Sequence, residues 1–310
     1  MGNIYRLQQG GYEIICEGDG SKAEVTGFEG AGSRMYIPDF ADSEKTVPIT
    51  SVGRKAVLAN KGLREVSLPG SVESLGDWAF AQCENMENFI IRAAVENTES
   101  SIANILFGKG VFDNCHKIKN ICVGYEEPDA LSYLLGTIIY KMPAEYLLKD
   151  NSIGSSEWFA MWDQCLSTFL NEPDIDGYTD MVLCGEEDIF YQEPDFAMNK
   201  RKKKAALCML RLMHDASLSD DMRNKYTDYV LSHVKGAPSE EAWEVLLEEY
   251  GDEVDYFRLL ADIGGITSDN IDGMFLDMGQ YHAEAKAYLL HYKQENMSSG
   301  GGSVFDEFEL

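Results

Sequence analysis

The chain has 310 residues, 45% of them hydrophobic, so it is long enough for two domains with cores of their own and is not intrinsically disordered. Its 53 acidic and 26 basic side chains give a formal net charge of -27, which repels phosphate backbones and anionic membranes. We therefore expect no nucleic-acid partner, although a surface that imitates DNA would carry the same charge. Seven cysteines without a CxxC pair indicate reduced thiols.

The N-terminal sequence MGNIYRLQQGGYEIIC has no apolar run as long as that of a signal peptide, and no later stretch reaches about 18 uncharged apolar residues. We therefore expect a cytoplasmic protein that inserts into no membrane. A chain from which a signal peptide had been removed would show the same pattern, so an extracellular or cell-surface location is the alternative.

Residues 12–28, YEIICEGDGSKAEVTGF, predict a β-hairpin with Asp19 and Gly20 in the turn. We expect this hairpin to cover the open end of the repeats that follow, because terminal repeats need a cap.

An internal repeat follows the hairpin. Residues 49–68 match residues 72–91 at an offset of 23, hydrophobic to hydrophobic, and a third copy follows at an offset of 32 after an insertion. A degenerate earlier copy surrounds Met35. One copy is too small to bury its own apolar face, so the copies must stack. The residues at matching positions include Gly53, Gly76 and Gly108; Ala56, Ala79 and Val111; and Asn60, Cys83 and Cys115.

Each copy contains a short run with a period of two, as in Val66, Ser67 and Leu68, which predicts a strand with alternate side chains inward and outward. The outward side chains form a candidate ligand-binding face that mixes charged, amide and apolar groups, so we expect a protein partner rather than a polyanion. These residues are Arg34, Tyr36, Glu65, Ser67, Asn88, Ile90, Asn120 and Cys122.

The unit LREVSLPGSVESLGDWAFAQCENMENFII, with its LP after the strand and its Gly-x-x-Ala-Phe segment, resembles the BspA-type leucine-rich repeat. The resemblance covers about residues 12–125. It departs at Ala56 and Val57, which replace the Ala-Phe pair, and in the third copy, which lacks LP. The resemblance implies a curved solenoid that binds proteins or other ligands and has no catalytic residues.

After Gly124 the strand pattern ends, and the sequence alternates capping residues, amphipathic runs and glycine stops, which predicts helices. We therefore expect an α+β protein with three parts: a short leucine-rich-repeat β-solenoid with a hairpin cap over 1–125, an all-α helical-hairpin domain over 126–295, and a flexible acidic and aromatic tail over 296–310. The last two helix pairs, 239–262 and 268–293, loosely resemble ankyrin or HEAT-like hairpins.

Five consecutive cations, Lys200 to Lys204 with Arg201, fall on a predicted helix. Such a run either pairs with the acidic segments of the chain or contacts an acidic partner. We favour a solvated helix face that is neutralised from within the chain.

No motif predicts catalysis, a cofactor or a metal. The cysteines and histidines lack the spacing of a zinc site, and the loop EPDIDGYTDMVL lacks the final glutamate of a calcium loop. No nucleophile elbow or phosphate-binding loop occurs. Cys83 and Cys115 share one repeat position, so we expect Cys83 to be buried and unreactive.

The tail contains a flexible Ser/Gly stretch, 298–303, followed by VFDEFEL. We interpret Val304, Phe305, Phe308 and Leu310 as a candidate docking peptide for an apolar groove of another protein. The alternative is an inert terminus.

These observations predict a non-catalytic scaffold or adaptor of bacterial type that binds a protein through the repeat and the tail. The alternatives are a cell-surface or secreted adhesin, and an enzyme with an interdomain site that matches no known motif. The sequence leaves the partner's identity and the oligomeric state open.

Overall fold

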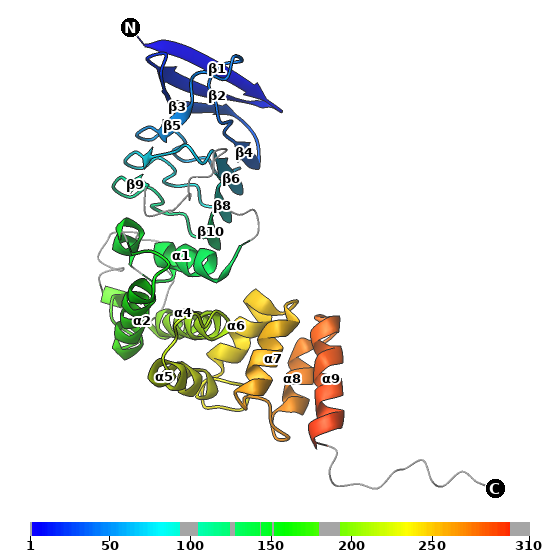
Figure 1. The fold of residues 1–310 in the computed structure, drawn as a ribbon. Coiled ribbons are helices and arrows are strands. Elements are labelled where there is room, and N and C mark those ends of the chain that lie inside the picture. The colour runs from blue at the N-terminus through cyan, green and yellow to red at the C-terminus, as the bar shows by residue number, and fades with distance from the viewer. Residues whose placement is uncertain are drawn as a thin grey trace, which may run out of the picture. The chain divides into compact units, whose positions relative to one another are not determined.

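The computed structural model describes residues 2–93, 105–124, 128–142, 144–150, 152–179 and 193–297. Strands precede residue 124 and helices follow it, so the predicted α+β layout is confirmed (Figure 1). The chain forms two compact units, Met1–Phe169 with Ala216–Leu218, and Leu170–Asp215 with Ser219–Leu310. The first unit thus includes helices that follow residue 125, and the division at residue 125 stays a prediction.

Two sheets build the strand part of the first unit. One has the order β1-β2-β3-β5-β7-β9 and the other β10-β8-β6-β4. The strands β1 to β3 pair antiparallel, and all later pairs in both sheets are parallel. The bounds are β1 Asn3–Gln9, β2 Tyr12–Gly18, β3 Ala23–Gly30, β4 Arg34–Tyr36, β5 Ile49–Val52, β6 Glu65–Leu68, β7 Ser74–Leu75, β8 Asn88–Ile91, β9 Leu106–Phe107 and β10 Asn120–Val123.

The hairpin formed by β2 and β3 is the predicted one. Asp19 closes its turn, because its carboxylate Oδ1 accepts hydrogen bonds from the backbone N of Ser21 at 2.8 Å and of Lys22 at 3.1 Å. Gly20 supplies the left-handed residue with φ of +93°. The strand β1 was not predicted. It adds to the outer edge of β2, and its side chains are exposed or half-buried, so it lacks the apolar pattern that marks the repeats.

The repeats are joined by a ladder of backbone hydrogen bonds. We call residues 54–59, 77–82 and 109–114 the first, second and third arch. The N–H groups of Lys55, Val57 and Ala59 donate to carbonyls of the second arch at 2.8 to 3.1 Å. The second arch donates in the same way to the third at 2.7 to 3.0 Å. Left-handed residues recur at two positions of each arch. At the second residue φ is 57° at Lys55, 55° at Trp78 and 55° at Gly110, and at the last residue it is 60° at Ala59, 61° at Gln82 and 60° at Asn114. The predicted repeat offsets therefore reappear as a repeated backbone geometry.

The repeated glycine before each arch is a steric requirement. A Cβ atom on Gly76 would lie 2.6 Å from the backbone N of Arg54, and one on Gly108 would lie 2.6 Å from the backbone N of Asp77. No side chain fits at that distance, so stacking of the copies depends on glycine at this position.

The largely aliphatic core of the stack contains an aromatic cluster. The ring of Phe89 lies edge-on to Phe80 and Phe112, with centroids 5.2 and 4.9 Å away. Next to this cluster, Cys83 Sγ donates to Val57 O at 3.2 Å, and Cys115 Sγ repeats the contact with Phe80 O at 3.3 Å. Cys83 is fully buried and forms no disulfide, as predicted from its repeat position.

Helices follow the last strand within the first unit. These are α1 (Ala130–Tyr140), the 3-10 helix η2 (Glu145–Lys149) and α2 (Ser156–Asn171). Asp129 caps α1 by accepting a hydrogen bond from Ser132 N at 2.8 Å. The helix packs on β10, and Trp162 Nε1 fixes it from the other side by donating to Leu134 O at 3.3 Å.

The second unit consists of helices. They are α4 (Glu193–Met213), α5 (Asp220–Leu231), α6 (Glu241–Tyr250), α7 (Val254–Asp262), α8 (Ile271–Met278) and α9 (Ala283–Met297). Ser219 caps α5 through a hydrogen bond from Met222 N. The pairs α6 with α7 and α8 with α9 agree with the predicted helical hairpins, and α4 packs against α5, α6 and α7.

The cationic run lies on α4 and is neutralised from within the chain. Lys204 Nζ donates to Glu172 O at 2.6 Å and to Asp174 Oδ1 at 2.7 Å, while Lys202 Nζ pairs with Glu244 and Glu248. The prediction of a solvated helix face holds only in part, because the side chain of Lys204 is buried. Its ammonium group replaces water at the carbonyls that follow α2, which is why this cation is buried. Asp174 also pairs with Arg201, so the loop that follows α2 binds two cationic side chains of α4.

Candidate functional site

The predicted outward residues lie in register across the second sheet. Arg34 stands opposite Glu65 and Tyr36 opposite Ser67 on β4 and β6. The same two rows continue through β8 and β10, where Asn88 stands opposite Asn120 and Ile90 opposite Cys122. The strand pairing is therefore the one that the repeat alignment implies. That these residues bind a ligand stays a prediction.

Only three strands of this sheet present the predicted residues to solvent. Asn120 is 4% exposed and Cys122 is 1% exposed, so the expectation that these two point outward to solvent is not met. The physical reason is α1, which covers β10. Gly136 of α1 sits so close to the sheet that an added Cβ would lie 2.3 Å from Lys119 O.

The covered end is held by polar contacts. Asn120 Nδ2 donates to Asn88 Oδ1 at 2.7 Å, and Cys122 Sγ donates to Asn120 Oδ1 at 3.3 Å. Burial raises the pKa of the Cys122 thiol, so it is a neutral donor and not a reactive thiolate. We call the six remaining residues the strand face: Arg34, Tyr36, Glu65, Ser67, Asn88 and Ile90.

Arg92 is the residue of this site that sequence reasoning missed. Its guanidinium carbon lies 4.1 Å from the centroid of the Tyr36 ring. The same group donates to Ile37 O at 2.7 Å, to Ser67 Oγ at 3.0 Å and to Asp39 Oδ1 at 3.3 Å. The signal in the sequence is its position, since it directly follows β8 where the preceding copy has Pro69 after β6.

Arg92 fixes the orientation of Tyr36, whose side chain would otherwise be free on an edge strand. Tyr36 is 45% exposed, so one side of its ring packs on the guanidinium and the rest is open to solvent. Its backbone N–H donates to the hydroxyl of Tyr12 at 2.9 Å, which ties β4 to the hairpin cap. The ring is therefore held by Arg92, and the backbone that carries it is held by Tyr12.

The remaining charges on the face are weakly coupled. Arg34 Nε lies 3.7 Å from Glu65 Oε2, and the Arg34 side chain is exposed, so this pair contributes little to stability. Both groups keep most of their capacity to pair with a partner.

A family model for the BspA type leucine rich repeat region matches residues 43–126 in six copies. Residues 43–126 are a BspA-type leucine-rich repeat region. The repeat pattern of the sequence predicts three copies and a degenerate one within about residues 12–125. The leucine-rich repeat region thus contains the arches, β6 and β8, whereas β4 and the hairpin precede it.

Two solved structures are similar to part of the chain. One is a leucine rich cell surface protein from Faecalibacterium prausnitzii A2-165, with 19% identity, a TM-score of 0.29, and coverage of 38% of this chain and 32% of that one. The other is a leucine-rich repeat protein from Bacteroides capillosus ATCC 29799, with 22% identity, a TM-score of 0.23, and coverage of 34% and 99%. The match spans about a third of the first structure. No curated protein matches the chain.

Neither a metal site nor a membrane span is found in the part of the chain that the structure describes. No group of three or more His, Cys, Asp or Glu side chains converges there on a point that could hold a metal ion. None of the helices placed by the structure has the length and apolarity needed to cross a bilayer. The candidate tail residues Val304, Phe305, Phe308 and Leu310 lie outside the described residues, so tail docking stays a prediction.

Proposed function

We propose that the protein is a non-catalytic scaffold that binds a protein partner through the strand face. In this proposal the leucine-rich repeats and the hairpin form a short β-solenoid whose role is to hold that face rigid. The ladder between the arches and the steric need for Gly76 support a rigid stack.

The observation that carries the proposal is the fixed pair of Tyr36 and Arg92. Tyr and Arg are the side chains that most often dominate the binding energy of protein interfaces. Ordering a free side chain on binding costs about 0.5–1.5 kcal/mol, and Arg92 already holds Tyr36 in one orientation. The face is therefore prepared for contact before a partner arrives.

The surroundings of Tyr36 also fit a protein interface. Arg34, Glu65 and Asn88 provide donors and acceptors in the neighbouring row, and Ile90 adds an apolar group in the same row as Tyr36. A polar rim around an aromatic centre is the usual arrangement of such interfaces. A polyanion is disfavoured because the face carries the carboxylate of Glu65 beside Arg34, in a chain whose formal net charge is -27.

The proposal is tested by comparing partner capture by three forms of the full chain. The strand-face variant carries Tyr36→Ala, Glu65→Ala and Asn88→Ala. The control variant carries Leu106→Ala and Ser51→Ala, in strands of the other sheet, and Glu73→Ala, directly before β7, which remove exposed or half-buried side chains. Thermal unfolding checks that both variants fold. The proposal requires that the strand-face variant loses a partner that the wild type and the control retain.

The location of the protein is a separate question with its own test. A cytoplasmic adaptor and a cell-surface adhesin both accord with leucine-rich repeats. Fractionation of the native host, followed by detection of the chain in the cytoplasmic and surface fractions, separates the two.

A further inference from the structure

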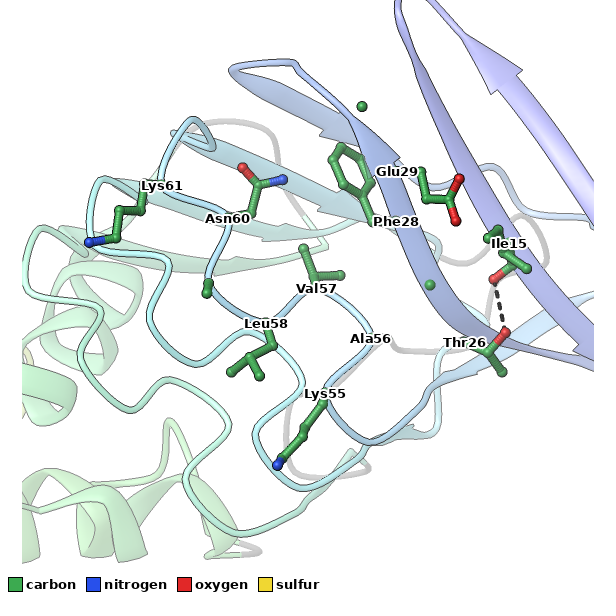
Figure 2. Close-up of a pocket in the computed structure, with 13 residues that line it drawn as sticks. Ile15, Thr26, Phe28, Glu29, Lys55, Ala56, Val57, Leu58, Asn60 and Lys61 are labelled. Carbon is green, nitrogen blue, oxygen red and sulfur yellow. Dashed lines mark hydrogen bonds between the residues drawn. The ribbon is translucent and has the colours of Figure 1, made fainter.

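A groove of about 530 Å³ opens beside the first arch. One wall is β3 with Ile15 of β2, and the other is the first arch together with Asn60 and Lys61. Figure 2 shows the arch facing β3 across this space, with Val57 on the arch side and Phe28 on the strand side. The groove lies at the start of the arch ladder and does not include any residue of the strand face.

The groove exists because the first arch has no arch before it. Pairing between β3 and β5 ends at Val25 and Val52, while β3 runs on to Gly30. From Gly53 the chain turns away into the arch, so among the described residues the last part of β3 has no parallel neighbour on that side. Two chain segments that diverge in this way leave a strand-shaped gap.

The arch wall of the groove offers a row of hydrogen-bond acceptors. In the second arch, the carbonyls of Asp77, Ala79 and Ala81 accept from the arch before them. The corresponding carbonyls of the first arch, one repeat earlier, belong to Ala56 and Leu58, which line the groove, and to Arg54, which directly precedes the lining residues. Within the described part of the chain no hydrogen bond reaches these three carbonyls. They occur at every second residue, which is the spacing at which an extended strand presents its N–H groups.

A cluster of cations adjoins the same wall. Around the ring of Trp78, the Arg54 guanidinium carbon, Lys55 Nζ and Lys109 Nζ lie 5.2, 5.5 and 5.7 Å from the centroid. None of the three cations forms an ion pair with another described residue, although acids outnumber bases two to one in the sequence. Lys55 belongs both to this cluster and to the groove.

We propose that the groove beside the first arch binds an extended acidic peptide segment of a partner protein as an added strand. The peptide N–H groups donate to the carbonyls of Arg54, Ala56 and Leu58, which gives affinity without sequence selection. Its carboxylates pair with Arg54, Lys55 and Lys109, which selects acidic segments. The strand face plays no part in this site, so either proposal can fail without the other.

The fluorescence of Trp78 provides a direct readout in the intact chain. The other three tryptophans, Trp158, Trp162 and Trp243, are fully buried, whereas Trp78 is half-buried at the surface. Quenching by acrylamide therefore reports mainly on Trp78. The probe is the blocked heptapeptide Glu-Val-Glu-Val-Glu-Val-Glu, and Lys-Val-Lys-Val-Lys-Val-Lys is the charge-reversed control. The acidic peptide is expected to protect Trp78 from quenching in a saturable manner, and the basic one is not.

Protein variants locate the binding. Lys55→Glu is expected to weaken binding of the acidic peptide about tenfold or more, because it replaces an attraction by a repulsion next to the groove. Lys22→Glu changes the net charge equally in the hairpin turn, away from the groove, and is expected to leave binding within about twofold of the wild type. Equal binding by wild type and Lys55→Glu overturns the proposal.

A second set of peptides tests the strand geometry. Methylation of alternate backbone nitrogens removes the donors along one edge of the peptide and leaves its charge unchanged. One of the two alternately methylated peptides is expected to bind at least about tenfold more weakly than the parent. If both bind like the parent, or if inorganic phosphate protects Trp78 equally well, the cluster is a plain anion site and the proposal is wrong. Sedimentation of the protein with and without peptide completes the test. If a second copy of the chain occupied the groove, the protein would form a dimer that the peptide dissociates. That result would also contradict a partner peptide as the occupant.

Discussion

The guanidinium of Arg92 lies over the ring of Tyr36, with 4.1 Å between its central carbon and the ring centroid. The two residues come from different copies of the repeat, and the hydrogen bond from Arg92 to Ile37 O spans 55 positions of the chain. One side chain at the end of β8 thereby connects to β6 and to the residues of β4, the strand at the edge of the sheet.

Arg92 is expected to stabilise the fold as well as the face. Arg92→Ala removes a half-buried cation and leaves Ile37 O without its side-chain donor, so we expect a loss of about 1–3 kcal/mol in the free energy of unfolding. Arg64→Ala serves as the control, since Arg64 is exposed and, among the described residues, forms one ion pair, with Glu87 at 3.2 Å. We expect the control to change stability by less than about 0.5 kcal/mol. Urea denaturation measures both, and equal effects would refute this role of Arg92.

The packing of α1 on β10 is expected to depend on Gly136. In Gly136→Ala the new Cβ would meet Lys119 O at 2.3 Å, so we expect a loss of about 1–3 kcal/mol despite the better helix propensity of Ala. Gly273→Ala in α8 is the matched control. Its Cβ would meet only the flexible end of Lys235 at 3.1 Å, and we expect it to be neutral or stabilising. Thermal unfolding compares the two, and a neutral Gly136→Ala contradicts the close approach.

The buried cysteines are expected to resist alkylation in the folded protein. Burial raises the pKa of the Cys83 thiol to about 11, so at pH 8 Cys83 is both protonated and inaccessible. Cys165 is half-buried on α2 and serves as the internal comparison. Mass spectrometry after brief treatment with iodoacetamide should find label on Cys165 before Cys83 and Cys115. Rapid native labelling of Cys83 would overturn its structural role.

Burial of Cys83 is also expected to appear in the dependence of stability on pH. A thiol with its ordinary pKa of 9.0 ionises in the unfolded chain, whereas Cys83 in the folded chain keeps its proton until about pH 11. The contribution of the protonated Cys83 thiol to the free energy of unfolding is therefore complete below pH 9 and is lost as the pH rises from 9 to 11. The maximal slope for one thiol is about 1.4 kcal/mol per pH unit.

The matched variant for this measurement is Cys83→Ala. Both forms are unfolded with urea at pH 7, 9 and 10.5, and the difference between them removes the contribution of the tyrosines. The wild type should lose more free energy of unfolding than the variant between pH 9 and 10.5. Parallel pH profiles would show that the Cys83 thiol is not protected.

Repeat periodicity was sufficient to predict the strand register, because stacking forces equivalent residues into one row. It predicted the pairing of Tyr36 with Ser67 and the burial of Cys83, and the composition of 12–28 predicted the hairpin. These features depend on local pattern alone.

Contacts between segments that are distant in the chain could not be predicted from a single sequence. Nothing in a periodic pattern states that α1 will cover Cys122, since a helix can follow a repeat without lying on it. The role of Arg92 was not predicted for the same reason, because its partners Ile37 and Asp39 lie more than 50 residues before it in the chain. The carbonyl row at the groove follows only from the absence of an arch before residue 54.

Binding of a protein partner by the strand face is measured as the affinity of a captured partner for the wild type, the strand-face variant and the control variant. Combined loss of Tyr36, Glu65 and Asn88 is expected to weaken binding about thirtyfold or more, as when an aromatic anchor is removed. The control with Leu106, Glu73 and Ser51 replaced should bind within about twofold of the wild type. Undiminished binding by a folded strand-face variant would show that the strand face is not the binding surface.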